Sequence, residues 1–398
     1  MSGWSRVRLG DCCEIVSGAT PDTSSDEFWG GDICWVTPKD LSGLQGHFIS
    51  DTPRKLTATG LASCSAATLP PNSVLFSSRA PIGHVAINTV PMATNQGFKS
   101  FIPGPTVDAK FLFRWLRANR PFLENLGVGA TFKEVSKSIV ANVQIPLPPL
   151  PEQRRIASIL DKADALRVKR REALAQLDRL AQAIFVEMFG DPMSPEGRWR
   201  PVPVSDFVAG FESGKSVAAE DEDDPSSRFR VLKVSAVTSL DFKPYESKAA
   251  PVDHVPQDSH FVRRGDLLFS RANTMELIGA TAYVSDTPDD LLLPDKLWRF
   301  VWHGEPLATP QFVNYLFRQP KFRAEIGRRA SGSSGSMKNI SQEKVMSIEV
   351  ALPPLSMQQE FSHRIEKLIL LKKAHSSAAE ASDALFASLQ HRAFRGAL

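Results

Sequence analysis

The strongest constraint on the fold is that the sequence contains one pattern twice. "LPPLPEQRRIASIL" begins at Leu147, and "LPPLSMQQEFSHRI" begins 205 positions later (352 − 147), at Leu352. A period of about 200 residues is far longer than the roughly 20–50 residues of a solenoid repeat. The chain has 398 residues, which is enough for more than one hydrophobic core. The repeat therefore predicts two similar domains in one chain.

The repeat extends well beyond the proline boxes. "WSRVRLGD" returns as "WRPVPVSD", "SVLFSSRA" as "DLLFSRAN", and "FLFRWLR" as "FVNYLFR", always in the same order. Each half is rich in short strand patterns and turn residues, with one helix near 108–126 or 309–328. The offset between matching motifs varies, as expected if loops change in length while the framework is kept.

A long helix is predicted after each proline box, over about 152–188 and 358–394. Proline is tolerated in the first helical turn, where its missing N–H would be unpaired anyway. Apolar residues then recur at steps of three and four. The predicted seam is Ile156, Ile159, Ala163, Leu166, Ala173, Leu177, Leu180 and Ile184 in the first helix, and Phe361, Ile365, Leu368, Leu371, Ala378, Leu385 and Leu389 in the second, with Arg170, His375 and Ser382 as polar interruptions.

A helix of this length, roughly 55 Å at 1.5 Å per residue, cannot bury its whole stripe against its own domain. We therefore expect the two helices to pair as an antiparallel coiled coil, with the halves related by a pseudo-two-fold axis. The alternative is that each helix packs locally. The predicted fold is α+β: mixed α/β domains at 1–150 and 191–355, each followed by a spacer helix, at 151–190 and 356–398.

Composition and motifs argue against a catalytic site. The net charge is +3, with 42% hydrophobic and 23% charged residues, as in ordinary globular proteins, and no apolar run suggests a signal peptide or membrane span. We expect a cytoplasmic protein. "ESGKS" at Glu212 lies one residue too close to Gly210 for a phosphate-binding loop, and Ser213–Gly214 aligns with the turn at Ser17–Gly18. The four cysteines lack metal or disulfide spacing, so we expect small buried residues.

Taken in order, the motifs resemble those of the specificity subunit of Type I restriction–modification systems. They are "SGATP" at Ser17, "WVTPKDL" at Trp35, "ATNQGF" at Ala93, "GATFKEVS" at Gly129 and the proline box with its helix. The second half departs from the pattern: "SMQ" replaces "PEQ" at Ser356, and "LPDKLW" replaces "TNQGF" at Leu293.

The resemblance implies a non-catalytic subunit with two target-recognition domains, each reading one half of a bipartite site in double-stranded DNA. It also implies that the helices and their roots dock two methyltransferase subunits, which carry S-adenosylmethionine, and that restriction–translocase subunits using ATP and Mg join the complex. No cofactor is expected in this chain. Two other functions remain open: a protein scaffold without a DNA role, and a cryptic DNA-modifying enzyme.

Reading bases requires forked hydrogen bonds from loop side chains, typically Arg to guanine and Asn or Gln to adenine. The candidate DNA-binding residues are Lys39, Ser78, Arg79, Asn95, Gln96, Thr131 and Lys133 in the first domain, and Lys233, Ser235, Arg271, Asn273, Lys296, Ser336 and Lys338 in the second. Arg79 and Arg271 are the strongest, because both are expected to end an apolar strand at equivalent places. The resemblance places partner docking at Pro148, Pro149, Glu152, Gln153, Arg154, Pro353, Pro354 and Gln358.

Overall fold

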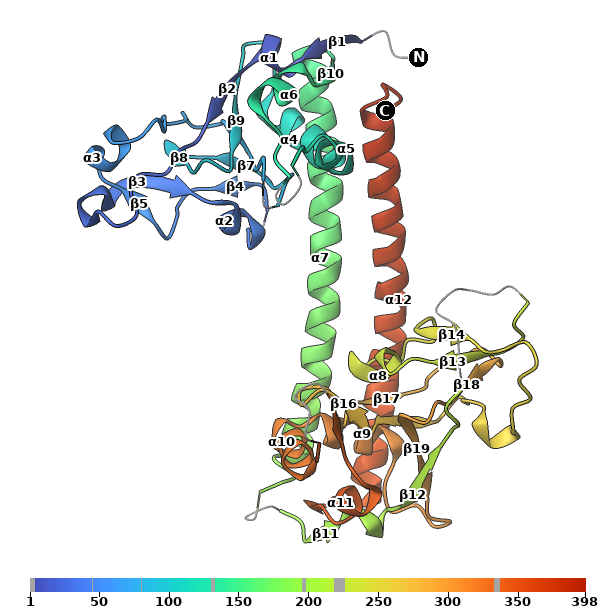
Figure 1. Ribbon diagram of the computed structural model, residues 1–398. Helices are drawn as coiled ribbons and strands as arrows, with labels where there is room; N and C mark the ends of the chain where they lie inside the picture. The colour runs from blue at the N-terminus through green and yellow to red at the C-terminus, as the bar shows by residue number, and fades with distance from the viewer. Residues whose placement is uncertain are drawn as a thin grey trace. The chain divides into compact units, whose positions relative to one another are not determined.

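The fold is described from a computed structural model (Figure 1), which describes residues 4–44, 46–79, 81–129, 133–194, 198–217, 226–332 and 337–398. The chain divides into two compact units. The first unit runs to Glu172 and includes Ser376–Leu398, and the second is Ala173–His375. The helices α7 (Leu150–Phe189) and α12 (Leu355–Ala393) contribute to both units.

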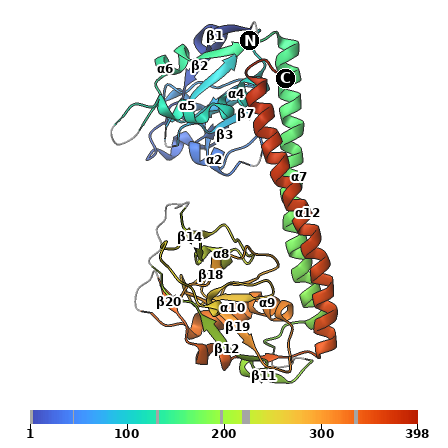
Figure 2. The ribbon, with the colours of Figure 1, turned by 90° about the vertical axis from the view of Figure 1, so that its right-hand side faces the viewer.

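The first unit is a mixed α/β structure, drawn in blue and cyan in Figure 2. Its strands are β1 (Ser5–Arg8), β2 (Cys13–Ser17), β3 (Trp29–Val36), β4 (Phe48–Ile49), β5 (Lys55–Leu56), β6 (Val74–Phe76), β7 (Val85–Asn88), β8 (Met92–Thr94), β9 (Lys99–Pro103) and β10 (Gln144–Leu147). Its short helices are α1 (Leu9–Cys12), α2 (Pro38–Ser42), α3 (Ala58–Ala62), α4 (Ala109–Ala118), α5 (Arg120–Asn125) and α6 (Lys137–Asn142), with a 3-10 turn at Asp26–Phe28.

A five-stranded sheet in the order β2-β9-β6-β7-β4 forms the centre of this unit, beside a three-stranded sheet β5-β3-β8. The amphipathic helix α4 packs against the central sheet, where Phe101 and Leu116 are fully buried. The Asp108 carboxylate accepts a hydrogen bond from the Phe111 N–H at 3.0 Å and so caps α4. Burial of this apolar face fixes where the loops after each strand emerge.

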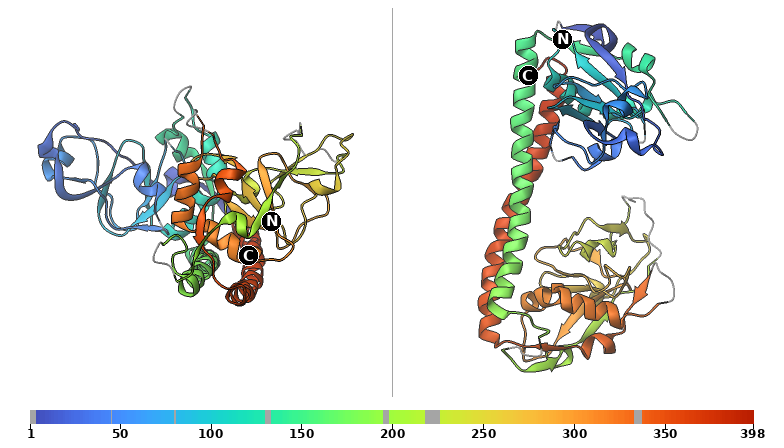
Figure 3. Two further views of the ribbon diagram at one scale, coloured as in Figure 1. Left: turned by 90° about the horizontal axis from the view of Figure 1, so that it is seen from below. Right: turned by 90° about the vertical axis from the view of Figure 1, so that its left-hand side faces the viewer.

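The second unit, drawn in yellow and orange on the right of Figure 3, has a similar order of elements, with a four-stranded central sheet β12-β19-β15-β17 and an added pair β16-β20. Its strands are β11 (Pro201–Pro203), β12 (Val208–Ser213), β13 (Arg230–Leu232), β14 (Ser247–Ala249), β15 (Leu267–Ser270), β16 (Ala272–Asn273), β17 (Thr281–Tyr283), β18 (Leu291–Leu292), β19 (Leu297–Trp302), β20 (Lys338–Asn339) and β21 (Glu349–Ala351). Its short helices are α8 (Ser235–Thr238), α9 (Pro310–Arg318), α10 (Pro320–Arg329) and α11 (Gln342–Met346), with 3-10 turns at Val204–Asp206 and Asp258–His260.

The pairing of strands confirms the internal repeat. In each unit the first strand pairs antiparallel with the strand before the proline box, β1 with β10 and β11 with β21. A parallel pair also recurs, β3 with β8 and β13 with β18, while the first unit has a second parallel pair, β4 with β7. Gly18 and Gly214 also match, because a Cβ on either residue would lie within 2.4 Å of a carbonyl oxygen. The oxygen belongs to Thr94 for Gly18 and to Leu293 for Gly214. "ESGKS" therefore runs from the end of β12 into a glycine that must approach another backbone closely, and Gly214 matches Gly18 as predicted.

The two long helices run antiparallel within each unit. In the first unit the Phe111 ring of α4 lies 5.6 Å from that of Phe394, which follows the end of α12. In the second unit the Phe312 ring of α9 lies 5.1 Å from that of Phe189, at the end of α7. Each globular part therefore packs on the end of the helix that belongs to the other half of the sequence. The predicted fold class is confirmed.

The predicted seam was partly wrong. Ile156 and Phe361 are buried as expected, but Leu160, and not Ile159, is the fully buried residue of the next turn. Four predicted seam residues are 46–57% exposed: Leu166, Leu180, Leu371 and Leu385. A strict three-and-four spacing drifts around a straight helix by about 20° per seven residues, so the contact face moves away from these leucines.

In each unit an ion pair connects the two helices, whereas the four leucines predicted for the seam are exposed. In the first unit Arg167 Nε lies 2.5 Å from Asp383 Oδ1, and in the second Lys372 Nζ lies 2.6 Å from Asp178 Oδ1. The two pairs occupy matching positions in the repeat, with the cation on one helix and the aspartate on the other. Of the four cysteines, all free thiols, Cys12, Cys13 and Cys34 are buried as predicted and Cys64 is half-buried.

Candidate nucleic-acid interface

Three chain segments of the first unit meet where β6 ends. The Ser78 N–H donates to the Gly97 carbonyl at 2.7 Å, and the Val135 N–H donates to the Ser78 carbonyl at 2.9 Å. Arg79 forms an isolated antiparallel bridge with Glu134. The residues after β6, the loop before β9 and the segment before α6 thus form one junction.

Several candidate side chains gather around Gly97 in this junction. A Cβ on Gly97 would lie 3.0 Å from Asn95 Oδ1, 3.2 Å from Pro38 Cγ and 3.6 Å from Arg79 Cγ. Lys39 follows Pro38 in α2, and both Lys39 and Gln96 are exposed. The structure therefore brings Lys39, Arg79, Asn95 and Gln96 to the same part of the surface.

The Arg79 guanidinium is held loosely. Its Nη1 lies 3.8 Å from Glu134 Oε2, with 35% of the side chain exposed, while Lys99 Nζ lies 3.2 Å from the other oxygen of the same carboxylate. Exposed ion pairs of this kind stabilise a fold by only about 0–1 kcal/mol. Arg79 can therefore leave Glu134 and bind a ligand instead. The exposed Lys133 precedes Glu134 in the sequence.

One further candidate of the first domain, Ser78, is not presented on this surface. Ser78 is fully buried, and its hydroxyl donates to the Gly97 carbonyl at 3.1 Å, so it supports the loop. Thr131 and Ser336 lie outside the described residues.

The second unit has the same junction with different side chains. The Arg271 N–H donates to the Lys296 carbonyl at 3.2 Å, and the Ile340 N–H donates to the Arg271 carbonyl at 3.1 Å. By this pattern Arg271 occupies the place of Ser78, and Ala272, which pairs with Asn339, occupies that of Arg79. The prediction that the two arginines end their strands at equivalent places was wrong by one residue, because the first half has one more serine before its arginine. Successive side chains of extended backbone point to opposite faces, so the two guanidinium groups are not equivalent.

Arg271 is oriented more firmly than Arg79. Its Nε donates to the Asp295 carbonyl at 2.7 Å, and its guanidinium carbon lies 5.9 Å from the centroid of the Trp298 ring. Asn273 pairs with Lys338 between β16 and β20. Lys296 is exposed next to Asp295. Four candidates of the second domain therefore lie at one junction: Arg271, Asn273, Lys296 and Lys338.

The other two candidates of the second domain contact the loop before β14. The Ser235 hydroxyl donates to Glu246 Oε2 at 2.7 Å, and the Lys233 N–H donates to the Glu246 carbonyl at 2.9 Å. These contacts hold the start of α8 to that loop.

Two predicted docking residues are internal. Gln153 is fully buried, its amide donating to the Thr106 and Pro148 carbonyls at 2.8 and 2.7 Å, and its oxygen accepting from the Asp108 N–H at 2.8 Å. Gln358 is equally buried and makes the same three bonds, to the Leu307 and Pro353 carbonyls and from the Thr309 N–H. The interpretation as docking contacts was wrong, because each amide is fully used in fastening the first turn of a long helix to its own unit.

In each proline box the second proline reaches the surface: Pro149 and Pro354 are exposed, whereas Pro148 and Pro353 are buried. In the first unit Pro148 and Pro149 line a notch of about 570 Å³ with Trp4. In the second, Pro353 and Pro354 line a notch of about 340 Å³ with Trp199. Arg154 is exposed, whereas Glu152 is half-buried and pairs with Arg155 at 2.7 Å.

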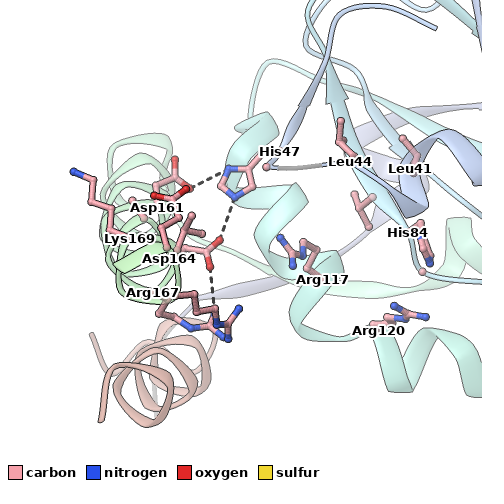
Figure 4. Close-up of a pocket in the computed structure, with 17 residues that line it drawn as sticks. Leu41, Leu44, His47, His84, Arg117, Arg120, Asp161, Asp164, Arg167 and Lys169 are labelled. Carbon is pink, nitrogen blue, oxygen red and sulfur yellow. Dashed lines mark hydrogen bonds and ion pairs between the residues drawn. The ribbon is translucent and has the colours of Figure 1, made fainter. Parts of the chain in front are cut away.

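A larger cleft of about 730 Å³ in the first unit lies between α7, α4 and the loop after α2 (Figure 4). The Arg114 side chain is 3% exposed and bonds to both Asp161 and Asp164 at 2.8 Å. His47 Nε2 lies 3.2 Å from Asp164 Oδ2 on the same side. The hydrogen bonds from His47 and Arg114 hold the pKa of the Asp164 carboxyl well below its ordinary value.

Because the carboxylates of this cleft are taken up by neighbouring cations, the network fastens the loop to α7. Sequence reasoning missed it, since the only signal was charged residues next to the expected apolar seam. Within the described residues, no group of His, Cys, Asp and Glu side chains is placed to hold a metal ion. Among all the residues that the structure describes, no helix has the length and apolar character needed to cross a membrane.

Comparison with known proteins shows which proteins this chain is similar to. The model of the Type I restriction modification DNA specificity domain matches residues 1–177. The MjaIX Type I restriction enzyme specificity subunit of Methanocaldococcus jannaschii is 34% identical over 216 residues, which cover 54% of this chain and 48% of the relative. In that match the chain spans about half the length of its relative. The MjaVIII specificity subunit of the same organism is 21% identical over 95% of this chain and 89% of its own.

A solved chain from work on complex assembly and conformational transition of the type I R-M system has the same fold. It matches with a TM-score of 0.58 at 19% identity and covers 100% of this chain and 99% of its own. The sequence matches, the duplicated units and this likeness of fold agree with one another. Residues 1–177 thus match a Type I restriction modification DNA specificity domain, and the chain is similar in sequence to Type I restriction enzyme specificity subunits.

Proposed function

We propose that this chain is the DNA-recognition subunit of a Type I restriction–modification complex, and that each globular part reads one half of a bipartite site. One observation carries the proposal: the same junction is built twice with different polar side chains. The first presents Lys39, Arg79, Asn95 and Gln96, and the second presents Arg271, Asn273, Lys296 and Lys338.

These residue types supply what base readout requires. Arginine can donate two parallel hydrogen bonds to guanine, and asparagine or glutamine can make a forked contact to adenine. A shared framework with different contact residues suits a site whose two halves differ in sequence. We include in the proposal the division into recognition domains at 1–150 and 191–355, with spacer helices at 151–190 and 356–398.

Docking of two identical partner chains is supported by a second duplication. Leu166 and Leu385 of the first unit are 56% and 57% exposed, and Leu371 and Leu180 of the second are 46% and 47% exposed. Leu166 and Leu371 occupy matching positions in the repeat, as do Leu385 and Leu180. We take the recurrence of these exposed leucines at the same places in both units as support for a protein-binding surface.

A surface that occurs once in each unit fits two copies of one protein. We therefore assign the leucine pairs, with the proline notches at Trp4 and Trp199, to two methyltransferase subunits. These would carry S-adenosylmethionine, and restriction–translocase subunits using ATP and Mg would join them. The whole complex would act on chromosomal DNA in the cytoplasm.

Purified chain should be catalytically silent, because we assign the methyl donor to its partners. Incubated with DNA and S-adenosylmethionine, it should transfer no methyl groups until a methyltransferase subunit is added, and sequencing should then show a bipartite methylated site. Methyl transfer by the chain alone would favour a cryptic DNA-modifying enzyme. Assembly with the partner without any DNA binding would favour a protein scaffold.

A further inference from the structure

Arg54 lies on an aromatic pair at the three-stranded sheet of the first unit. Its guanidinium carbon is 3.7 Å from the centroid of the Trp29 ring and 5.1 Å from that of Trp35. The two indole rings meet edge to face, with centroids 5.0 Å apart and planes at 78°. Contact with two rings restricts the guanidinium plane and so fixes the direction of its N–H groups.

The hydrogen-bonding edges of this guanidinium are open. Arg54 is exposed, and among the described residues its side chain has no ion-pair or hydrogen-bond partner. The nearby Asp51 carboxylate is taken up by Lys55, whose Nζ lies 3.0 Å from Asp51 Oδ1. An exposed guanidinium in a fixed plane is prepared to donate two parallel hydrogen bonds, the geometry that recognises O6 and N7 of guanine.

The rings under Arg54 are fastened to the candidate interface. The indole N–H groups of Trp35 and Trp29 donate to the carbonyl oxygens of residues 19 and 22, at 3.0 and 3.1 Å. Between these two, the Thr20 hydroxyl donates to the side-chain oxygen of Gln96. The aromatic pair and Gln96 thus hold the same loop, which places Arg54 on a surface continuous with the Gly97 junction.

The matching sheet of the second unit carries a different arrangement: the guanidinium carbon of Arg228 lies 5.4 Å from the centroid of the Phe229 ring, which meets Phe261 edge to face. β13 pairs with β18 as β3 pairs with β8, and this register puts Val231 at the position of Trp35. An effect of Arg54 should therefore be confined to one half of a bipartite site.

We propose that Arg54 is a specificity-determining residue of the first recognition domain, donating a forked pair of hydrogen bonds to one guanine of its half-site. This inference rests on the proposed function of the chain as a DNA-recognition subunit. Sequence reasoning missed Arg54, because its two tryptophans are separated from it along the chain and only the fold assembles the stack.

The test is to map methylated sites in full-length chain carrying Arg54→Lys or Arg54→Ala, assembled with its methyltransferase subunits. Lysine keeps the charge but cannot donate the parallel pair, so both variants should relax the requirement at one base position of one half-site. About tenfold or more of the discrimination at that position should be lost. The other half-site should be read as before.

Arg6→Ala is the matched control, since Arg6 is exposed on β1, and it should leave the methylated sequence unchanged. Methylation by both Arg54 variants as strict as that of the unchanged chain would overturn the proposal. So would a loss of affinity equal for all sequences with a flatter salt dependence, which indicates a phosphate contact. Failure of the proposed function would be seen separately, as an unchanged complex that methylates no bipartite site.

Discussion

At the scale of single residues, the two strand-end arginines differ in how much they must give up to bind DNA. Arg79 leaves only a 3.8 Å contact with Glu134, whereas Arg271 keeps a 2.7 Å bond to a backbone carbonyl that need not be broken. Their residue types and loop positions could be predicted from the sequence. Their non-equivalence could not, because the effect of the extra serine in the first motif depends on the backbone pairing of the residues around it, which only the structure shows.

We expect Arg79→Ala and Arg271→Ala each to damage the reading of one half-site only. If the arginine makes a forked contact to guanine, its removal should cost about 1–3 kcal/mol of binding free energy at one base position, because a single bidentate pair is lost. A phosphate contact would instead weaken binding to all sequences and lower the salt slope by about one. The measurement is binding of the assembled complex, at several salt concentrations, to sites altered in one half at a time. Affinity equal to that of the unchanged chain in both variants would refute a DNA role for these residues.

At the scale of helices, the sequence predicts existence and extent better than the contact face. The proline boxes mark where α7 and α12 begin, and a long three-and-four pattern is hard to satisfy with any other structure. Which side of each helix is buried depends on small rotations that accumulate over many turns, so Leu166 was assigned to the seam although Arg167 occupies it. The role of Gln153 was equally hidden, since its three partners are backbone groups.

The structure separates a stabilising position from a docking position on the same helix. Gln153→Ala leaves a buried N–H and two carbonyls without a partner, at roughly 1–3 kcal/mol for such a group, so the unfolding temperature should fall. Binding of the folded chain to methyltransferase subunits should be unaffected. Leu166→Ser with Leu385→Ser should do the reverse, keeping the unfolding temperature and weakening partner binding. Calorimetry and a binding titration on both variants decide between these roles. If Gln153→Ala lost partner binding while its unfolding temperature stayed unchanged, Gln153 would be a docking residue after all.

At the scale of the whole molecule, the repeat is one of contacts as well as of sequence. Phe111 is packed by Phe394 in the first unit, and the matching Phe312 is packed by Phe189 in the second. The ion pairs Arg167–Asp383 and Lys372–Asp178 repeat in the same crossed manner. Each half of the sequence therefore supplies the helix end that the globular part of the other half requires.

A fragment ending at Gly190 tests this crossed arrangement. It keeps the first globular part and α7 but loses the α12 residues that cover Phe111, Ile156 and Leu160. An exposed apolar surface of this kind should not remain in a monomer. Because Phe189 matches Phe394, the α7 end of a second copy can supply the missing contact in the same antiparallel sense, giving a two-fold dimer with identical patches on both chains.

The two identical globular parts of this dimer should then read a palindromic split site made of the first half-site and its inverted copy. Sedimentation would reveal the dimer, and methylation mapping with the methyltransferase subunit would reveal its site. If the fragment stayed monomeric and stable, or its dimer still read the asymmetric parent sequence, the crossed contacts would not be what joins the halves.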